Sequence, residues 1–185
     1  MTERILEDTA RAHDFRYVSL RYFNVAGADS RQRTGQSTIG ATHLIKRACQ
    51  VALGHYDHLD IFGTDFPTPD GTAIRDYIHV SDLVEAHILA LEHIEAGDAS
   101  RTFNCGYGRG FSVREVVDVV SHIAGHKLPT RDAPRRTGDP PEIVADPARM
   151  KTAFGWQPTH GDLETIVETA YAWEKHIHSN GANAS

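Results

Sequence analysis

The sequence of 185 residues predicts an α/β protein, because strand-like and helix-like stretches alternate along its length. The strand-like stretches are short runs of aromatic and β-branched residues, and the helix-like stretches repeat apolar residues every three or four positions. Hydrophobic residues make up 40% of the chain, which is enough for a core and excludes disorder by composition. The length suits one compact domain or two small lobes.

The charge and the cysteines exclude several classes of partner. A net charge of −6 argues against nucleic acid, whose phosphates favour a clustered positive surface. Cys49 and Cys105 are too few for a disulfide framework and favour a reducing compartment. No apolar run approaches the ~20 residues that span a bilayer, and the start MTERILEDTA has no signal-peptide core. We therefore expect a soluble, cytoplasmic protein that binds neither nucleic acid nor a membrane.

The first half of the chain contains two expected helices and two expected strands. Apolar residues on one side predict a helix over 2–13, and RYVSLRYFNVAG predicts one buried strand over 16–27. After a polar loop, apolar residues at helical spacing predict a second helix over 42–54. LDIFG at 59–63 is a short strand, and the prolines and Asp-Gly of 64–73 are typical of turns.

The second half contains four more expected helices and one strand. A helix over 81–97 takes Ser81 as its N-cap and ends at a glycine, and RTFNCG at 101–106 is a strand. The next helix opens with a capping box between Ser112 and Glu115. Asp146 is the expected cap of a further helix, with Pro147 in its first turn. The final helix is expected over 162–178, and 179–185 is expected to be a disordered tail.

Two motifs resemble parts of a dehydrogenase site but fail on inspection. The glycines Gly106, Gly108 and Gly110 miss the dinucleotide fingerprint, because Phe111 stands where its third glycine is required. We interpret them as a tight strand-to-helix turn near a ligand. The Tyr-x-x-x-Lys spacing of YAWEK, residues 171–175, falls on the apolar stripe of the final helix, which predicts core packing rather than a catalytic base. The 12 histidines show no spacing typical of a metal site.

Two arginines are the strongest candidates for ligand binding. Arg75 lies between apolar neighbours in GTAIRDYIHV, and Arg136 lies in PRRTGDPPEI. An arginine in a partly apolar setting usually faces a fixed anion, and two such residues far apart in sequence suit a pyrophosphate. The alternative is an internal ion pair, for example between Arg75 and Asp76 or Asp82. The residues alone leave both interpretations open.

The chain contains, in order, the blocks SLRYFNVAGAD, THLIKRACQVALG, IFGTDFPTPDGTAIRDYIHVSDLVEAHILAL, FNCGYGRGFSV and RRTGDPPEIVADPARMKTAFGWQP. These blocks resemble the UDP-glucose 4-epimerases, which are NAD-dependent extended short-chain dehydrogenases/reductases. The resemblance implies the C-terminal portion of a Rossmann-type enzyme, mainly its substrate-binding lobe with residual sheet strands. The family's glycine fingerprint, catalytic Thr or Ser and Tyr-x-x-x-Lys would all precede the equivalent of Met1. It therefore implies no catalytic residue in this chain, and NAD held mainly by the missing N-terminal half.

The resemblance also implies a division of the chain. Residues 1–37 would be a remnant of the NAD-binding domain, and 38–178 would be mainly the UDP-sugar-binding lobe, with 73–105 returning to the Rossmann core. The partner would be a UDP-hexose, and the full-length protein would be a homodimer. Because the strand at 17–23 would lack its usual neighbours, we expect the isolated chain to aggregate or to be marginally folded.

The family pattern assigns binding roles to specific positions. Phe23 would border the nicotinamide end of NAD. The residues that would contact the UDP-sugar are Asn24, His43, Leu44, Asp60, Ile61, Phe62, Arg75, Tyr77, Arg136, Asp139 and Ile143. Arg75 and Arg136 would clamp the diphosphate, Asn24 would bind a phosphate, and Asp139 would accept a ribose hydroxyl.

Three further roles follow from the same pattern. His43 and Leu44 would line the nucleotide pocket, and the backbone of 60–62 would read the edges of uracil with the Phe62 ring against the base. Ile143 replaces a tyrosine of some members, and a smaller residue there implies room for UDP-N-acetylglucosamine. Two alternatives to the epimerase remain open: a non-catalytic UDP-sugar-binding fragment, and another nucleotide-sugar epimerase, dehydratase or decarboxylase of the same superfamily.

Overall fold

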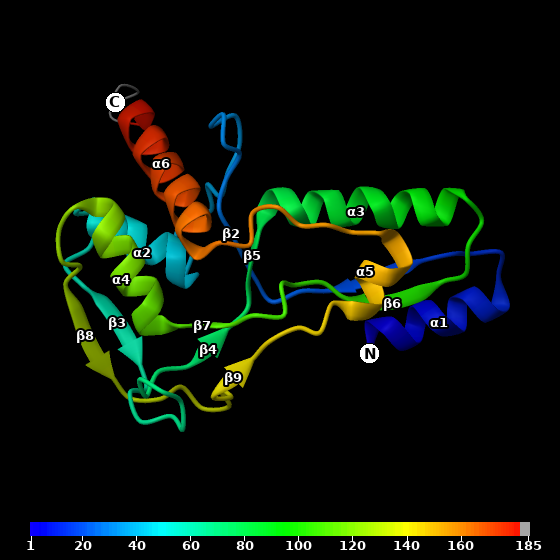
Figure 1. Ribbon diagram of the computed structural model, residues 1–185, viewed down its shortest axis with the longest axis horizontal. Helices are drawn as coiled ribbons and strands as arrows, with labels where there is room; N and C mark the ends of the chain where they lie inside the picture. The colour runs from blue at the N-terminus through cyan, green and yellow to red at the C-terminus, as the bar shows by residue number, and fades with distance from the viewer. Residues whose placement is uncertain (182–185) are drawn as a thin grey trace.

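Two groups of elements lie toward opposite ends of the computed structural model, which describes residues 1–181 (Figure 1). One group, the α2 lobe, consists of α2 (Leu44–Ala52), β3 (Leu59–Phe62), α4 (Val113–Ala124), β8 (Thr130–Ala133) and α6 (Leu163–Gly181). The other, the α3 lobe, consists of α1 (Thr2–Ala12), β1 (Val18–Arg21), α3 (Val80–Glu95), β6 (Arg101–Asn104) and α5 (Ala148–Phe154). Between them run the short strands β2 (Asn24–Ala26), β4 (Ile74–Arg75), β5 (Tyr77–His79), β7 (Phe111–Ser112) and β9 (Glu142–Ile143).

Strand pairing within residues 1–181 is mostly parallel. The pairs β1–β6, β2–β5 and β3–β8 are each parallel two-stranded sheets. In the fourth sheet β4 lies between β7, which is antiparallel to it, and β9, which is parallel. Parallel neighbours need a long crossover connection, and helices supply it here, so the predicted α/β class is confirmed.

The single strand expected over 16–27 is wrong, because the chain forms two strands there. β1 pairs with β6 and β2 pairs with β5, and the break between them falls at Tyr22 and Phe23, whose side chains are both exposed. The apolar run continues across the break, so the local sequence gives no sign of it. The chain changes partner strands at this point, and the change carries it from the α3 lobe to the central strands.

The helices follow the predicted pattern more closely than the strands do. The capping box is confirmed: the Ser112 hydroxyl accepts from the Glu115 N–H, and the Glu115 carboxylate accepts from the Ser112 N–H. The predicted start of α5 is wrong by one residue, because Pro147 is the N-cap and Asp146 lies before it, although the Asp146 carboxylate does accept from the Ala148 N–H.

Two further predicted helix ends are wrong. The N-cap of α3 is His79, not Ser81, because the His79 Nδ1 accepts from the Ser81 N–H at 3.1 Å. At the other end of the chain α6 continues to Gly181, so residues 179–181 are helical where disorder was expected. The remaining residues of that expected tail, 182–185, lie outside the described residues.

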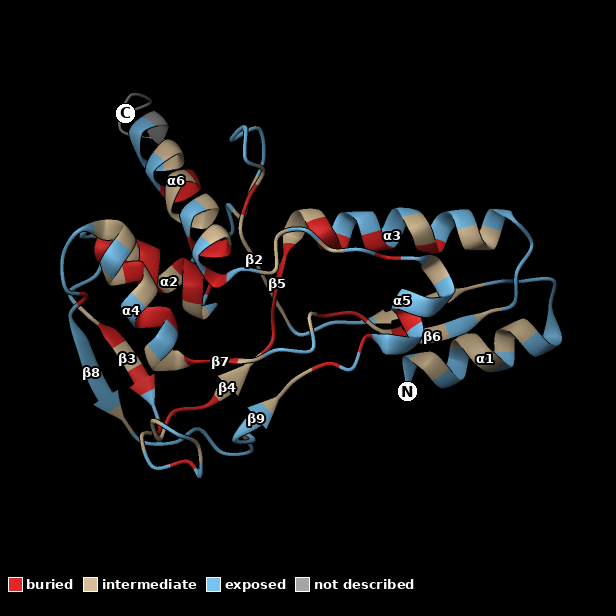
Figure 2. Ribbon diagram, in the orientation of Figure 1, coloured by how far each residue is buried: buried red, intermediate tan, exposed pale blue. Residues whose placement is uncertain are grey.

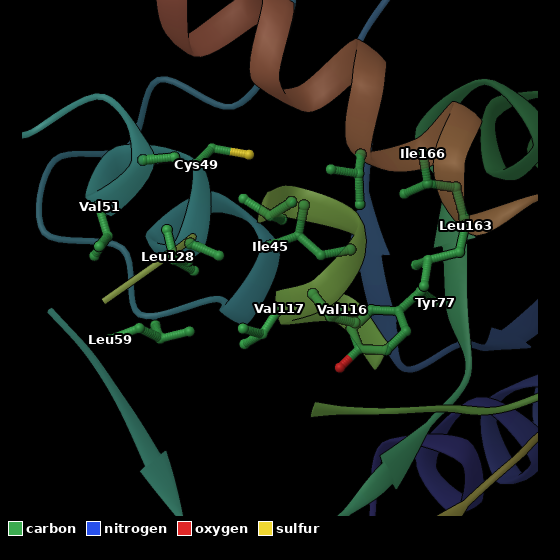
Figure 3. Close-up of a cluster of buried hydrophobic side chains, with 14 of the residues drawn as sticks. Ile45, Cys49, Val51, Leu59, Tyr77, Val116, Val117, Leu128, Leu163 and Ile166 are labelled. Atoms are coloured by element: carbon green, nitrogen blue, oxygen red, sulfur yellow. The ribbon is translucent and has the colours of Figure 1, made fainter. Parts of the chain in front are cut away.

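The larger cluster of buried apolar side chains lies in the α2 lobe, where α2, α4 and α6 pack against one another (Figure 2). Figure 3 shows Ile45 of α2, Val116 of α4 and Ile166 of α6 in this cluster, with Tyr77 of β5 at its border. A second, smaller cluster lies under α3 and contains Ile78, Leu83, Ala86, Phe103, Cys105, Met150 and Trp156. None of the helices within residues 1–181 combines the length and apolar character needed to cross a membrane.

Candidate functional site

A hollow of about 700 Å³ opens between α2, β3, the central strands and the loop before β9. Its wall consists of Asn24, Thr42, His43, Leu44, Arg47, Tyr56, Asp57, His58, Leu59, Asp60, Phe62, Ala73, Arg75, Tyr77, Val113, Arg136 and Asp139. These residues come from six separate stretches of sequence. The fold therefore assembles the hollow, and no single motif contains it.

Nine of the eleven residues that the sequence assigned to the UDP-sugar line this one hollow, all but Ile61 and Ile143. The side chain of Ile61 is buried on the opposite face of β3. Ile143 pairs with Arg75 across β9 and β4, and its carbonyl accepts from the Asp76 N–H at 3.0 Å. Phe23, assigned to NAD, also lies outside the hollow and exposes its ring after the end of β1.

Arg75 is held in place by the strand that carries it. β4 is the middle strand of its sheet, and the Arg75 Nη1 donates to the carbonyl of Ile74 at 2.7 Å. Within residues 1–181 Arg75 forms no ion pair, so the alternative of an internal ion pair with Asp76 or Asp82 is wrong. The remaining guanidinium donors of Arg75 are free to face the hollow.

Asp76 is unavailable to Arg75 because backbone donors already surround its carboxylate. It accepts from the N–H groups of Tyr107, Gly108 and Ala145 at 3.1–3.2 Å. Burial raises the pKa of this carboxyl, and these three hydrogen bonds oppose that rise. The glycine loop thus binds an internal carboxylate, and a Cβ on Gly106 would lie 2.6 Å from the Asp76 Oδ2. The expected tight strand-to-helix turn is wrong: residues 105–110 contain only bends and lead into β7 before α4 begins, and their glycines do not line the hollow.

Asp82 is likewise engaged elsewhere, in a polar cluster under α3. It accepts from the Tyr107 hydroxyl at 2.6 Å, and the His160 Nδ1 lies 2.8 Å from its other oxygen. Burial alone would raise the pKa of Asp82, but these hydrogen bonds outweigh burial and lower it. His79 stacks on His160 with ring centroids 4.6 Å apart, and burial lowers its pKa to about 4. His79 is therefore neutral near pH 7.

Arg136 stands across the hollow on the loop before β9. Its Nε donates to Asp139 at 2.8 Å, and its guanidinium carbon lies 5.2 Å from the centre of the Phe62 ring. Both Arg136 and Phe62 are exposed. A cation above an exposed aromatic ring offers one surface for an anion and another for a flat ring.

β3 presents a free backbone edge to the same hollow. Leu59 donates to the carbonyl of Pro129, just before β8, and Gly63 donates to that of Ala133 in β8, at 2.9 Å each. Backbone groups of successive strand residues point to opposite edges, so those of Asp60 and Phe62 point away from β8. No other strand within residues 1–181 pairs with that edge. Its N–H and C=O groups can therefore hydrogen-bond a flat heterocycle.

Asn24 and His43 also line the hollow. His43 is the N-cap residue of α2, and its Nδ1 lies 2.8 Å from the Gln36 side-chain amide. Asn24 opens β2 beside Tyr77, and its amide makes a long 3.4 Å contact with the Asp76 carbonyl. Burial raises the pKa of Tyr77, so its hydroxyl stays protonated.

The Tyr-x-x-x-Lys sequence of α6 packs on the core, as predicted. Tyr171 lies against the α2-lobe cluster, and the Lys175 Nζ is 5.7 Å from the centre of its ring. The histidines do not form a metal centre among residues 1–181: no group of three or more metal-ligating side chains is found there.

The sequence analysis missed several residues in the wall of the hollow. They are Thr42, Arg47, Tyr56, Asp57, His58, Leu59, Ala73 and Val113. Arg47 is the only cation among them. Its one local signal was its position on α2, one turn after His43, and this had no meaning until the hollow was known.

Parallel strand pairs joined by helices, with a polar hollow beside the ends of the strands, define an α/β protein of the Rossmann type. A model of the NAD dependent epimerase/dehydratase family matches residues 1–106, and the chain belongs to that family.

Several relatives of the chain are named UDP-glucose 4-epimerase. A UDP-glucose 4-epimerase of Azospirillum brasilense is 54% identical over 184 residues, which are all of this chain but 53% of the relative. The crystal structure of UDP-glucose 4-epimerase from Brucella ovis with NAD matches 92% of the chain at 45% identity and a TM-score of 0.88, over 52% of that structure. The enzyme from Bifidobacterium longum with NAD⁺ and UDP matches 94% at 34% identity and 0.88, also over 52%. The chain thus spans about half the length of these relatives.

Proposed function

We propose that the hollow binds the uridine diphosphate part of a UDP-hexose, and that the chain serves as the UDP-sugar-binding part of a UDP-glucose 4-epimerase. The observation that carries this proposal is the convergence of Arg75 and Arg136, 61 positions apart, on one hollow that also has a free backbone edge. The names of the relatives and the UDP in the Bifidobacterium longum structure support it.

Each part of UDP has a partner of suitable chemistry. The two guanidinium groups face the diphosphate, because arginine donors match phosphate oxygens in geometry and charge. The base lies on the Phe62 ring and hydrogen-bonds to the backbone edge at Asp60 and Phe62. Asp139 accepts from the ribose, while its other contact, with Arg136, orients both side chains.

These contacts with the nucleotide are suited to inversion at carbon 4 of the sugar. NAD, when bound, would supply the reversible removal of hydride from that carbon. Phe23, whose ring is exposed after the end of β1, is the residue of this chain that would border its nicotinamide. The residues of this chain hold the nucleotide, so the hexose can present either face without leaving the protein. Remote binding energy is thereby used for positioning.

The proposal is tested by titration calorimetry of the chain with UDP, UMP and ADP. We expect UDP to bind more tightly than UMP, because the second phosphate completes the contact with the arginines, and ADP to bind more weakly than UDP. Equal affinities for the three nucleotides would contradict the proposal. The epimerase activity is tested on the protein expressed from its own gene, by following conversion of UDP-galactose into UDP-glucose; a dehydrated or decarboxylated product would favour the alternative enzymes.

We also propose that Ile143 leaves room for an N-acetylated sugar. Its strand lies beside Arg75, so a larger side chain there would crowd the sugar end of the ligand. We expect UDP-glucose and UDP-N-acetylglucosamine to bind the parent with similar affinity, and Ile143→Tyr to weaken only the second. An equal loss for both sugars would contradict this role.

A further inference from the structure

Arg47 lines the hollow, but the proposed function gives it no role. It lies on α2, and its backbone N–H donates to the carbonyl of His43 at 2.9 Å. The helix therefore fixes where its side chain starts. Because Arg75 and Arg136 account for the diphosphate in the proposed function, a third guanidinium in the same wall needs a different explanation.

The guanidinium of Arg47 is held in one orientation. Its central carbon lies 3.6 Å from the centre of the Tyr56 ring, which is a close cation–π contact. Its Nη1 has almost no accessible surface and no hydrogen-bond partner among residues 1–181. Because Nη1 is covered, a ligand in the hollow would meet the guanidinium through its other N–H groups.

The carboxylate of Asp60 is not the acceptor for these N–H groups. Asp60 feels the charge of Arg47, but its carboxylate accepts from the Arg131 Nε at 2.8 Å and lies 3.5 Å from the His58 Nε2. The hydrogen bond from Arg131 is the main reason that the pKa of Asp60 is lowered. Arg47 is thus close to the start of β3 without being paired to it.

The position of Arg47 separates it from the diphosphate arginines. Tyr56, on which Arg47 stacks, comes three residues before β3 begins, whereas Arg136 lies over Phe62 at the end of that strand. Between these two points lies the backbone edge that the proposed function assigns to the base. Arg47 therefore borders the base end of the hollow.

We infer that Arg47 is a base-recognition residue, whose guanidinium donates to a carbonyl oxygen on the pyrimidine of the nucleotide while Tyr56 holds it in place. The inference rests on the proposed function, because it needs the base to lie along β3. A guanidinium suits this task, since it donates strongly, keeps its charge and cannot accept.

The test compares uridine, UMP and UDP as ligands of the full chain and of Arg47→Met. A contact with the base is common to all three, so we expect the affinity for each to fall by the same factor, about tenfold or more. Tyr56→Leu removes the stacking platform and should lower the three affinities in the same equal way. Arg109→Met is the matched control, because Arg109 also stacks on an aromatic ring, Phe111, but lies outside the hollow; it should change none of them.

The possible outcomes distinguish a failure of the role inferred for Arg47 from a failure of the proposed UDP-binding function. A loss that grows from uridine to UDP would assign Arg47 to the phosphates and overturn the inference. Unchanged affinities in both Arg47→Met and Tyr56→Leu, with melting temperatures near that of the parent, would overturn it as well. If the parent binds none of the three ligands, the proposed function fails and the inference falls with it.

Discussion

The two lobes of the molecule differ in how completely they bury their apolar side chains. In the α2 lobe three helices close over a cluster of fifteen buried residues. In the α3 lobe the cluster has seven, α1 buries none of its residues, and α3 exposes Val84, Ile88 and Leu91 along one stripe (Figure 2). The same chain thus contains one closed core and one that is covered on part of its surface.

The difference shows where stability and binding reside. The walls of the candidate hollow come mainly from the closed α2 lobe and the strands beside it, so its residues rest on a well-packed base. The α3 lobe offers open strand edges and an apolar stripe, which favour association with other surfaces. We therefore expect substitutions in the first lobe to affect folding and those in the second to affect self-association.

The largest effect is expected from one substitution made in both lobes. Ile166 is 0% exposed in α6, and Ile88 is 52% exposed in α3. Ile166→Ala should lower the free energy of unfolding by about 2–5 kcal/mol, because it leaves a cavity among packed helices. Ile88→Ala should lower it by less than about 0.5 kcal/mol. Urea denaturation of the two variants measures both values, and equal losses would show that the lobes do not differ.

The next effect is a pH dependence that originates in the buried His79. Its pKa in the folded chain is about 4 against an ordinary 6.5. As the pH falls from 7 to 5, His79 becomes protonated in the unfolded chain but stays neutral in the folded chain. The free energy of unfolding therefore decreases over this range. The loss attributable to His79 should be about 2 kcal/mol.

Denaturation at pH 7 and pH 5 tests this, with His79→Gln as the comparison. The variant should lack about 2 kcal/mol of the loss seen in the parent. Asp82 does not affect this comparison, because its pKa is lowered and its protonation changes the free energy of unfolding only below about pH 5. The same difference between the two pH values in parent and variant would exclude His79 as the source.

A smaller effect is expected at the capping box of α4. Ser112 accepts from the Glu115 N–H and donates to the Asp70 carboxylate, and it is buried. Ser112→Ala should therefore cost about 1 kcal/mol of stability, whereas Ser112→Thr should retain most of it. Thermal unfolding of the two variants measures the difference, and a fully stable alanine variant would show that the cap contributes nothing.

The smallest effect on stability should come from charging the exposed stripe of α3. Ile88→Lys should leave the melting temperature within a few degrees of the parent. In sedimentation experiments the same variant should associate less than the parent, because the charge interrupts the stripe formed with Val84 and Leu91. A parent that stays monomeric at high concentration would contradict this view of the α3 lobe.

The helices of this protein could be predicted from the sequence because their signals are local. The capping box of α4 is formed by residues three positions apart, and the apolar spacing of α2 falls within nine residues. Neither signal needs tertiary information. The strand at 16–27 could not be predicted correctly, since its break depends on which strands pair with each part. The N-cap of α3 was missed because the imidazole of His79 acts as the acceptor, a role that Ser81 would ordinarily take.

The candidate site was predictable only in part. The resemblance to a family supplied nine residues that the structure brings to one hollow, but the residues alone left Arg75 undecided between an anion and Asp76. That choice depends on the Gly106–Gly110 loop, which engages Asp76 from a distant part of the sequence. Arg47 was missed for a similar reason, because its partner Tyr56 and the hollow exist only in the folded chain. The division of the chain at residue 37 and the homodimer stay predictions.

The most direct test of the proposed function is the affinity for UDP of Arg75→Ala and Arg136→Ala, measured beside that for uridine. If both guanidinium groups face one diphosphate, each variant should lose about 2–5 kcal/mol of binding free energy for UDP and little for uridine. A variant of either arginine that binds UDP as tightly as the parent would contradict the shared diphosphate site.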